Sequence, residues 1–140
     1  MIVVDASALV AVLLQEPESM VFRRMMAREK DLVLSPVGYW EAATRLRSLR
    51  GEPGVVDLDL VIAKLGIRIA PATSRTASLA ASAERDFGKR TAAKLNLGDC
   101  FAYALAKESD APLLFKGDDF GRTDPVSYTH LRAHETDSYL

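Results

Sequence analysis

The sequence has very little cysteine and histidine, the residues that most often bind zinc or act as nucleophile and base. Its 140 residues include one cysteine and two histidines, which excludes an intramolecular disulfide and a thiolate metal cluster. The single thiol, Cys100, is most simply explained as a small buried apolar residue. Because a low cysteine content agrees with a reducing compartment, we expect a cytoplasmic protein.

The sequence also lacks a long apolar run and an excess of charge of either sign. Its longest uninterrupted apolar stretch, Ala8 to Leu14, is too short to cross a bilayer. The N-terminus has no basic region of the kind that opens a secretory signal. Since the formal net charge is only −1, bulk charge does not point to a nucleic acid or a membrane surface. We expect no association with membranes.

The C-terminal segment 126–140 differs in character from the rest of the chain. Residues 126–136 read VSYTHLRAHET, which resembles one reading frame of a transposon-type sequencing adapter. Both histidines, His130 and His134, lie in this segment. We therefore predict a single domain over 1–125, followed by a non-native tail over 126–140.

Short apolar stretches alternate with helical patterns along 1–125. Strands are expected at 1–4, 32–35, 67–72 and 112–116, and helices at 6–15, 18–28, 37–50, 57–65, 73–87 and from about 99 onward. The motif GEPG at 51–54 is expected to separate two of the helices. Strands that alternate with helices indicate parallel βα units. The predicted fold is α/β, with three layers (α/β/α) and a mostly parallel central sheet of four to five strands.

Acidic residues fall where such a sheet gathers functional groups. Asp5 closes the first strand, Glu41 lies early in the helix after the second, and Asp99 opens a late helix. Asp118 and Asp119 follow the last strand. Functional sites in open parallel sheets form at the carboxyl ends of the strands, so these acids are expected to converge. Each also has a simpler explanation, because aspartate is common at helix caps and in turns.

A cluster of these carboxylates would require bound protons or a cation. Two carboxylates about 4 Å apart repel by roughly 4 kcal/mol at an effective dielectric constant of 20. Hard oxygen ligands without sulfur or imidazole select Mg²⁺ or Mn²⁺, and such an ion suits phosphoryl transfer. Ser7 can hydrogen-bond a carboxylate at this site, although a role as a helix cap explains it equally well.

Four motifs occur in order along the chain: MIVVDASALVAVLLQEPE, YWEAATRL, LNLGDCFAYALAKE and LLFKGDDFGRTD. Together they resemble the VapC-type toxin ribonucleases of the PIN-domain family, over essentially all of 1–125. The resemblance implies a PIN-like fold and an endoribonuclease that depends on Mg²⁺ or Mn²⁺. It also implies a VapB-like antitoxin as partner, RNA as substrate and, usually, a homodimer.

The resemblance extends to individual residues. It implies a catalytic set of Asp5, Glu41, Asp99 and Asp118, with Asp119 as the alternative fourth acid one residue further on. Asp5 and Asp99 are the expected metal ligands, and the number of ions, one or two, stays open. Ser7 matches a small hydroxyl residue that supports the site. Relatives continue after the last motif with a short apolar strand, so here this edge strand is either absent or formed by the tail.

Basic residues near the expected site are candidates for RNA contacts. Lys89, Arg90 and Lys94 lie in the loop that leads into Asp99, and Lys116 precedes the fourth acid, so these four are the predicted phosphate contacts. Further basic residues lie on the helix of Glu41, namely Arg45, Arg47 and Arg50. An exposed charge on a helix is most often only solvated.

Two other functions are compatible with parts of the pattern. A receiver-like signalling domain also uses acids at strand ends, but it needs paired acids after the first strand, where this chain reads VVDASAL. A PIN-like binding module that is inactive as a nuclease usually lacks one or more of the acids, whereas all four positions are acidic here. A tail in place of the edge strand keeps this second alternative open.

Overall fold

A parallel β-sheet forms the centre of the molecule in this computed structural model, which describes residues 1–117 and 130–132. Its strand order is β3-β2-β1-β4-β5. The strands are β1 (Ile2–Val4), β2 (Leu32–Leu34), β3 (Ile67–Ile69), β4 (Leu113–Phe115) and β5 (His130–Arg132). Every neighbouring pair runs parallel.

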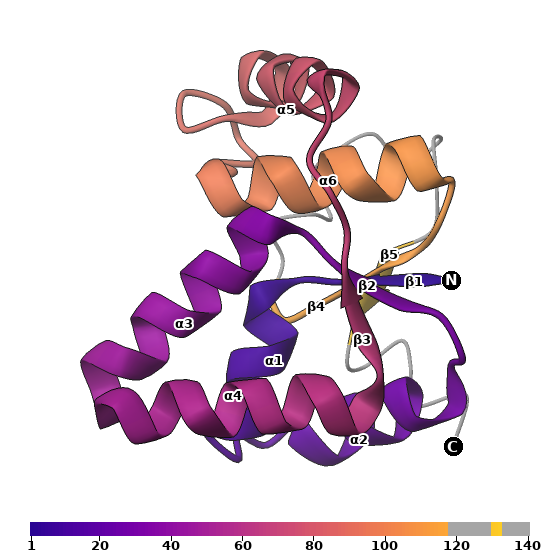
Figure 1. The fold of residues 1–140 in the computed structure, drawn as a ribbon. Coiled ribbons are helices and arrows are strands. Elements are labelled where there is room, and N and C mark those ends of the chain that lie inside the picture. Colours follow the sequence, from indigo (N-terminus) through magenta and orange to yellow (C-terminus); the bar gives the residue numbers. More distant parts are fainter. Residues whose placement is uncertain (118–129, 133–140) are drawn as a thin grey trace.

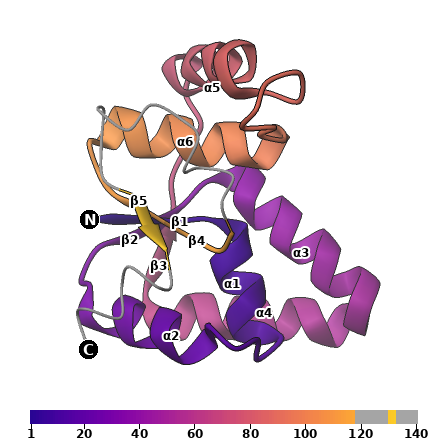
Figure 2. The same cartoon turned by 180° about the vertical axis from the view of Figure 1, so that it is seen from behind.

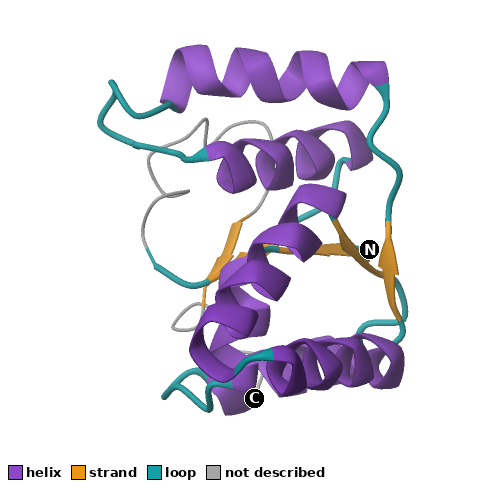
Figure 3. Ribbon diagram, turned by 60° about the vertical axis from the view of Figure 1, so that its left-hand side comes forward, coloured by secondary structure: helices purple, strands orange, loops and turns teal. Residues whose placement is uncertain are grey.

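Helices cover both faces of the sheet, as Figures 1 and 2 show from opposite sides. They are α1 (Ala6–Leu13), α2 (Ser19–Arg28), α3 (Pro36–Arg50), α4 (Glu52–Leu65), α5 (Ser74–Phe87) and α6 (Leu97–Ser109). Figures 1 and 3 show α5 and α6 stacked on one side of the sheet and α2 and α4 on the other. Residues of α1 share a core with α2 and α4. The predicted three-layer α/β/α fold with a mostly parallel sheet is therefore confirmed.

The alternation of side chains along each strand produces two separate cores. Ile2 and Val4 point into the core shared with α1 to α4, whereas Val3 points into the core shared with α5 and α6. β4 divides in the same way, because Leu114 joins the first core while Leu113 and Phe115 join the second. Burial on both faces explains why the three central strands β2, β1 and β4 are entirely apolar.

Two helices begin at least two residues earlier than the sequence-based expectation. α4 begins at Glu52, not at 57, because only Gly51 breaks the chain between α3 and α4: its φ is 70°, and Pro53 fits the first turn of the new helix. α6 begins at Leu97, two residues before Asp99, because the side chain of Asn96 caps it.

The edge of the sheet beside β4 is occupied by residues of the C-terminal segment. The backbone of His130–Arg132 pairs in parallel with Leu113–Phe115, so of the two expectations for this edge the structure shows a strand formed by the tail. The division into a domain over 1–125 and a non-native tail stays a prediction. Within the described part of the chain, none of the helices has the length and apolar character needed to span a membrane.

Candidate active site

Asp5 lies at the junction between β1 and α1, at the carboxyl end of a central strand. It is the N-cap of α1, and its Oδ2 accepts a hydrogen bond from the backbone N–H of Ser7 at 3.0 Å. The side-chain oxygen of Ser7 accepts a second bond, from the backbone N–H of Lys116 at 2.9 Å. Asp5 is therefore a helix cap, as one interpretation of the sequence proposed, and Ser7 is not. The hydrogen bond of Ser7 instead links the start of α1 to the residue that follows β4.

Asp99 lies in the first turn of α6 and is also part of a cap. Its backbone N–H donates to Oδ1 of Asn96 at 2.8 Å, and its Oδ2 accepts from the N–H of Asn96 at 3.0 Å. This reciprocal pair is a capping box. The Asp99 side chain is only 8 % exposed, and the box fixes its carboxylate at the amino end of the helix.

Glu41 reaches the same region from α3, where its side chain lies against Gly98 of α6. A Cβ atom at Gly98 would lie 2.3 Å from Oε2 of Glu41 and 2.7 Å from its Cδ. The Glu41 carboxylate therefore rests directly against the backbone of Gly98. Any larger residue at 98 would displace it.

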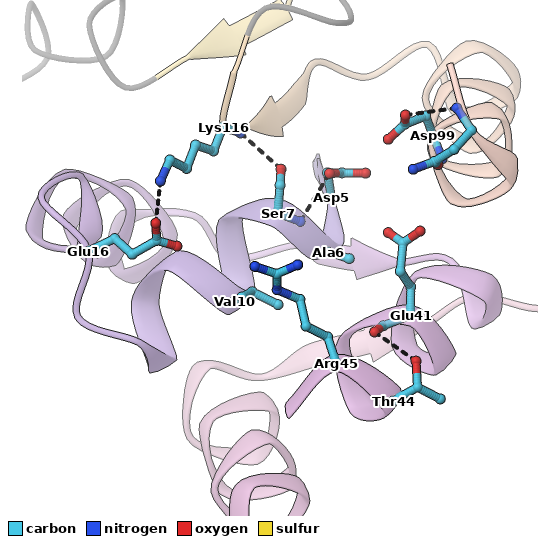
Figure 4. A pocket seen from close by; sticks show the side chains of 11 residues that line it. Asp5, Ala6, Ser7, Val10, Glu16, Glu41, Thr44, Arg45, Asp99 and Lys116 are labelled. Carbon is cyan, nitrogen blue, oxygen red and sulfur yellow. Dashed lines mark hydrogen bonds and ion pairs between the residues drawn. The ribbon is translucent and has the colours of Figure 1, made fainter. Parts of the chain in front are cut away.

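The three carboxylates line one pocket of about 540 Å³. Figure 4 shows the side chains of Asp5, Glu41 and Asp99 pointing toward a common space from three different elements. The remaining lining residues are Ala6, Ser7, Val10, Glu16, Thr44, Arg45, Asn96 and Lys116. The structure thus brings together Asp5, Glu41 and Asp99, as predicted. Asp118 and Asp119 lie outside the described residues.

Burial and mutual repulsion raise the pKa values of Asp5 and Glu41 and make their carboxyl groups hard to ionise. Burial raises the pKa of Asp5 from 3.8 to about 6, against the lowering effect of the Ser7 hydrogen bonds, and the charge of Glu41 raises it further. Burial also raises the pKa of Glu41, with a second contribution from the charge of Asp99, while Arg45 opposes the rise. A site that disfavours its own negative charges favours a bound cation.

The donor set, which is oxygen without sulfur or imidazole, fits Mg²⁺ or Mn²⁺ better than zinc. Across the described ranges, no group of three or more His, Cys, Asp or Glu side chains is arranged to hold one ion directly. Mg²⁺ does not require such a cage, because it usually binds through one or two carboxylates and keeps several waters. Asp5 and Asp99 can supply those carboxylates from opposite walls of the pocket.

The basic residues predicted from the sequence are distributed unevenly around this pocket. Lys116 lines it and forms ion pairs with Glu16 and Glu18. Lys89, Arg90 and Lys94 are exposed and do not line it. Lys89 instead borders a separate, mostly apolar pocket between α5 and α6, and Arg90 pairs with Glu84 at 3.6 Å. Their contact with RNA stays a prediction.

Three residues at the site were not singled out by the sequence analysis. Asn96 was detectable, since an Asn three residues before an Asp at a helix start is a capping-box signal. Gly98 was not detectable, because the sequence pattern places it in the loop before the expected helix and a glycine is ordinary in a loop. Glu16 lines the pocket and lies within the first of the four motifs, but no local signal singles it out from that stretch.

The chain belongs to the PIN domain family, whose model matches residues 2–125. Within that family it is similar to VapC ribonucleases. Ribonuclease VapC30 of Mycobacterium tuberculosis is 42% identical over 123 residues, which cover 87% of this chain and 94% of that protein. Ribonuclease VapC of Mycolicibacterium smegmatis is also 42% identical, over 87% of this chain and 95% of that one. The VapC-type PIN assignment made from the four motifs is confirmed.

Solved structures share the same fold at low sequence identity. Mycobacterium tuberculosis VapC20, a toxin that cleaves the sarcin-ricin loop, matches with a TM-score of 0.72 and 16% identity, over 86% of this chain and 93% of that chain. VapBC2 from Rickettsia felis, bound to a DNA fragment of its promoter, matches with a TM-score of 0.70 and 14% identity, over 94% and 98%. These likenesses support the fold.

The buried carboxylate of Asp5 is expected to lower the stability of the protein at neutral pH when a chelator is present. Its folded-state pKa of about 6 lies above the ordinary value of 3.8, so its favourable contribution is complete below pH 3.8 and is lost as the pH rises through 6. Asp5→Asn removes this loss of stability, because an amide does not ionise, and asparagine is also a good N-cap residue. We expect the variant to have a free energy of unfolding higher by about 2 to 3 kcal/mol at pH 7 and little changed near pH 4.

Urea denaturation at the two pH values measures this difference. Asp86→Asn is the matched control, because Asp86 is exposed on α5 and pairs with its neighbour Arg85. An equal free energy of unfolding for wild type and Asp5→Asn at pH 7 would contradict the expectation.

Proposed function

We propose that the chain is a metal-dependent endoribonuclease and the toxin of a VapBC-type toxin–antitoxin pair. The observation that carries this proposal is the convergence of three buried or half-buried acids from β1–α1, α3 and α6 on one pocket of a VapC-type PIN domain. Neither alternative explains this site as well. A receiver-like domain needs paired acids after β1, and only Asp5 is there.

The catalytic set in this proposal is Asp5, Glu41, Asp99 and Asp118, with Asp119 as the alternative fourth acid. Asp5 and Asp99 are the proposed metal ligands, because both carboxylates are held in place by backbone N–H groups at helix starts. Glu41 enters from α3, where it is half-buried against Gly98, and it is placed to accept a proton. Its raised pKa brings it closer to the range in which proton transfer is efficient.

PIN-domain VapC nucleases are metal-dependent as a family, and we propose Mg²⁺ or Mn²⁺ for this chain. When bound, such an ion supplies a nucleophilic water and stabilises charge on the phosphate. The protein's own contribution is rigidity. Ser7 connects α1 to the end of β4, which fixes the direction of Asp5, and the capping box fixes Asp99.

The proposed partners follow from the VapC assignment. A VapB-like antitoxin is supported by the VapC relatives and by the fold shared with VapBC complexes. RNA as the substrate and a homodimer as the working assembly are part of the same proposal. Lys89, Arg90, Lys94 and Lys116 remain the proposed RNA contacts, although Lys116 would first have to separate from Glu16 and Glu18.

Cleavage of end-labelled RNA with and without divalent ions tests this function. We expect internal cleavage with Mg²⁺ or Mn²⁺, complete loss with a chelator, and recovery when excess ion is added back. Cleavage that persists in chelator would contradict the metal-dependent site. RNA binding without cleavage in any ion would favour the inactive binding module. A chain that ends at Asp124, assayed beside the full chain, shows whether the segment 126–140 impairs activity.

A further inference from the structure

Arg45 lines the acidic pocket but has no role in the catalytic set described above. We propose that Arg45 binds a phosphate group of the RNA strand inside this pocket and is thus a substrate-binding residue. This inference rests on the proposed ribonuclease function, because it names a contact for the same substrate at the same site.

Arg45 follows Glu41 by one turn of α3, so the two side chains project from neighbouring positions on one face of the helix. Both line the pocket. In Figure 4 the Arg45 guanidinium extends from α3 toward α1 and lies beside Val10, below the carboxylates of Asp5 and Glu41. A strand of RNA that reaches those acids would pass close to this group.

Arg45 is also available, in contrast to the other basic residues nearby. Of the two cationic side chains that line the pocket, Lys116 is occupied by ion pairs with Glu16 and Glu18. On α3, Arg47 pairs with Glu52, and Arg50 donates to the backbone oxygen of Leu13. Arg45 is exposed and forms no hydrogen bond or ion pair with any residue that the structure describes.

The charge of the pocket explains why RNA needs such a contact. Among the residues that the structure describes, four acids line it, namely Asp5, Glu16, Glu41 and Asp99, and they repel a polyanion. The guanidinium group is always charged and offers two parallel N–H donors that match a phosphate. A competing explanation is that Arg45 only offsets the charge of Glu41. These two roles predict different results.

RNA binding by full-length variants separates them. Fluorescence anisotropy with a short single-stranded RNA of mixed sequence gives Kd over a series of salt concentrations, in an Asp99→Asn background that prevents cleavage. The Asp99→Asn protein is compared with two double variants, which carry Arg45→Gln or Arg45→Lys in addition. Arg47→Gln is the matched control, because Arg47 lies on the same helix but outside the pocket.

We expect Arg45→Gln to weaken binding about tenfold or more, as the loss of a charged hydrogen bond does. The slope of log K against log salt should become shallower by about 0.7, the value for one phosphate contact on single-stranded nucleic acid. Arg45→Lys should keep the salt slope of the background, and its affinity should lie between those of the background and of Arg45→Gln. Arg47→Gln should match the background in both measurements.

An Arg45→Gln variant with the affinity and salt slope of the background overturns the inference. If Arg45→Gln and Arg47→Gln weaken binding equally, the effect is general charge and the inference is again wrong. A different result would contradict the proposed ribonuclease function, namely that the chain with Asp99 intact does not cleave RNA in any divalent ion. If the Asp99→Asn background binds no RNA, the inference about Arg45 falls, while cleavage by the chain with Asp99 intact still decides the proposed function. Thermal melting of each variant identifies any loss of fold.

Discussion

Replacing Asp99 with asparagine is expected to reduce RNA cleavage at least about a hundredfold while leaving the protein folded. Loss of a residue that merely supports a metal ligand commonly costs 10- to 100-fold, and Asp99 is a proposed ligand. The fold should survive because the oxygen of an asparagine side chain can still accept the hydrogen bond from the backbone of Asn96. Initial rates of cleavage at saturating Mg²⁺ measure the effect.

The matched control for this variant is Asp86→Asn, which makes the same chemical change on the exposed surface of α5. Its cleavage rate should equal that of the wild type. Equal rates for Asp99→Asn and the wild type would remove Asp99 from the site. A large fall in melting temperature for Asp99→Asn would instead show that its role in the helix cap outweighs its role in the pocket.

Gly98→Ala is expected to reduce cleavage by about a hundredfold without a comparable loss of stability. The added Cβ would lie 2.3 Å from Oε2 of Glu41, so the carboxylate has to move. Because the obstructed atoms are the end of a flexible side chain, Glu41 can turn away without unfolding the helices. Alanine also favours the helix by up to about 1 kcal/mol over glycine. A displacement of about 1 Å at a reacting group can cost 10²-fold in rate.

A double-mutant cycle shows whether this effect acts through Glu41. Glu41→Gln should reduce cleavage by itself, and adding Gly98→Ala to Glu41→Gln should then reduce it little further. Independent, additive losses would mean that the alanine disturbs α6 and not the carboxylate. Melting temperatures of the three variants, measured in the presence of a chelator, complete the comparison.

Much of the fold could be predicted from the sequence because it follows from local patterns. The short apolar strands and the helical periods are properties of neighbouring residues, and the parallel order brings Asp5, Glu41 and Asp99 to one end of the sheet. The start of α4 could not be predicted as readily. The motif GEPG contains two glycines and a proline, and only the backbone conformation shows that Gly51 alone is the break.

The details of the site depend on how α3 packs against α6, and no local pattern encodes this packing. The contact between Glu41 and Gly98 joins residues far apart in the sequence. The free position of Arg45 depends on which of its neighbours find acidic partners, as Arg47 does with Glu52. The occupied state of Lys116 depends on the turn between α1 and α2, which brings Glu16 and Glu18 to it.

The double use of Asp5 and Asp99, each a cap residue and a pocket acid, has a consequence for the evolution of this family. Aspartate and asparagine differ by a single base in the genetic code. Either residue serves well as the N-cap at position 5, and the side-chain oxygen of either can accept the capping-box hydrogen bond at position 99. One base change can therefore abolish the proposed chemistry without a loss of stability against which natural selection could act. Non-cleaving descendants of such a toxin can persist as folded proteins, so the identity of residues 5 and 99 is a better guide to activity than overall similarity.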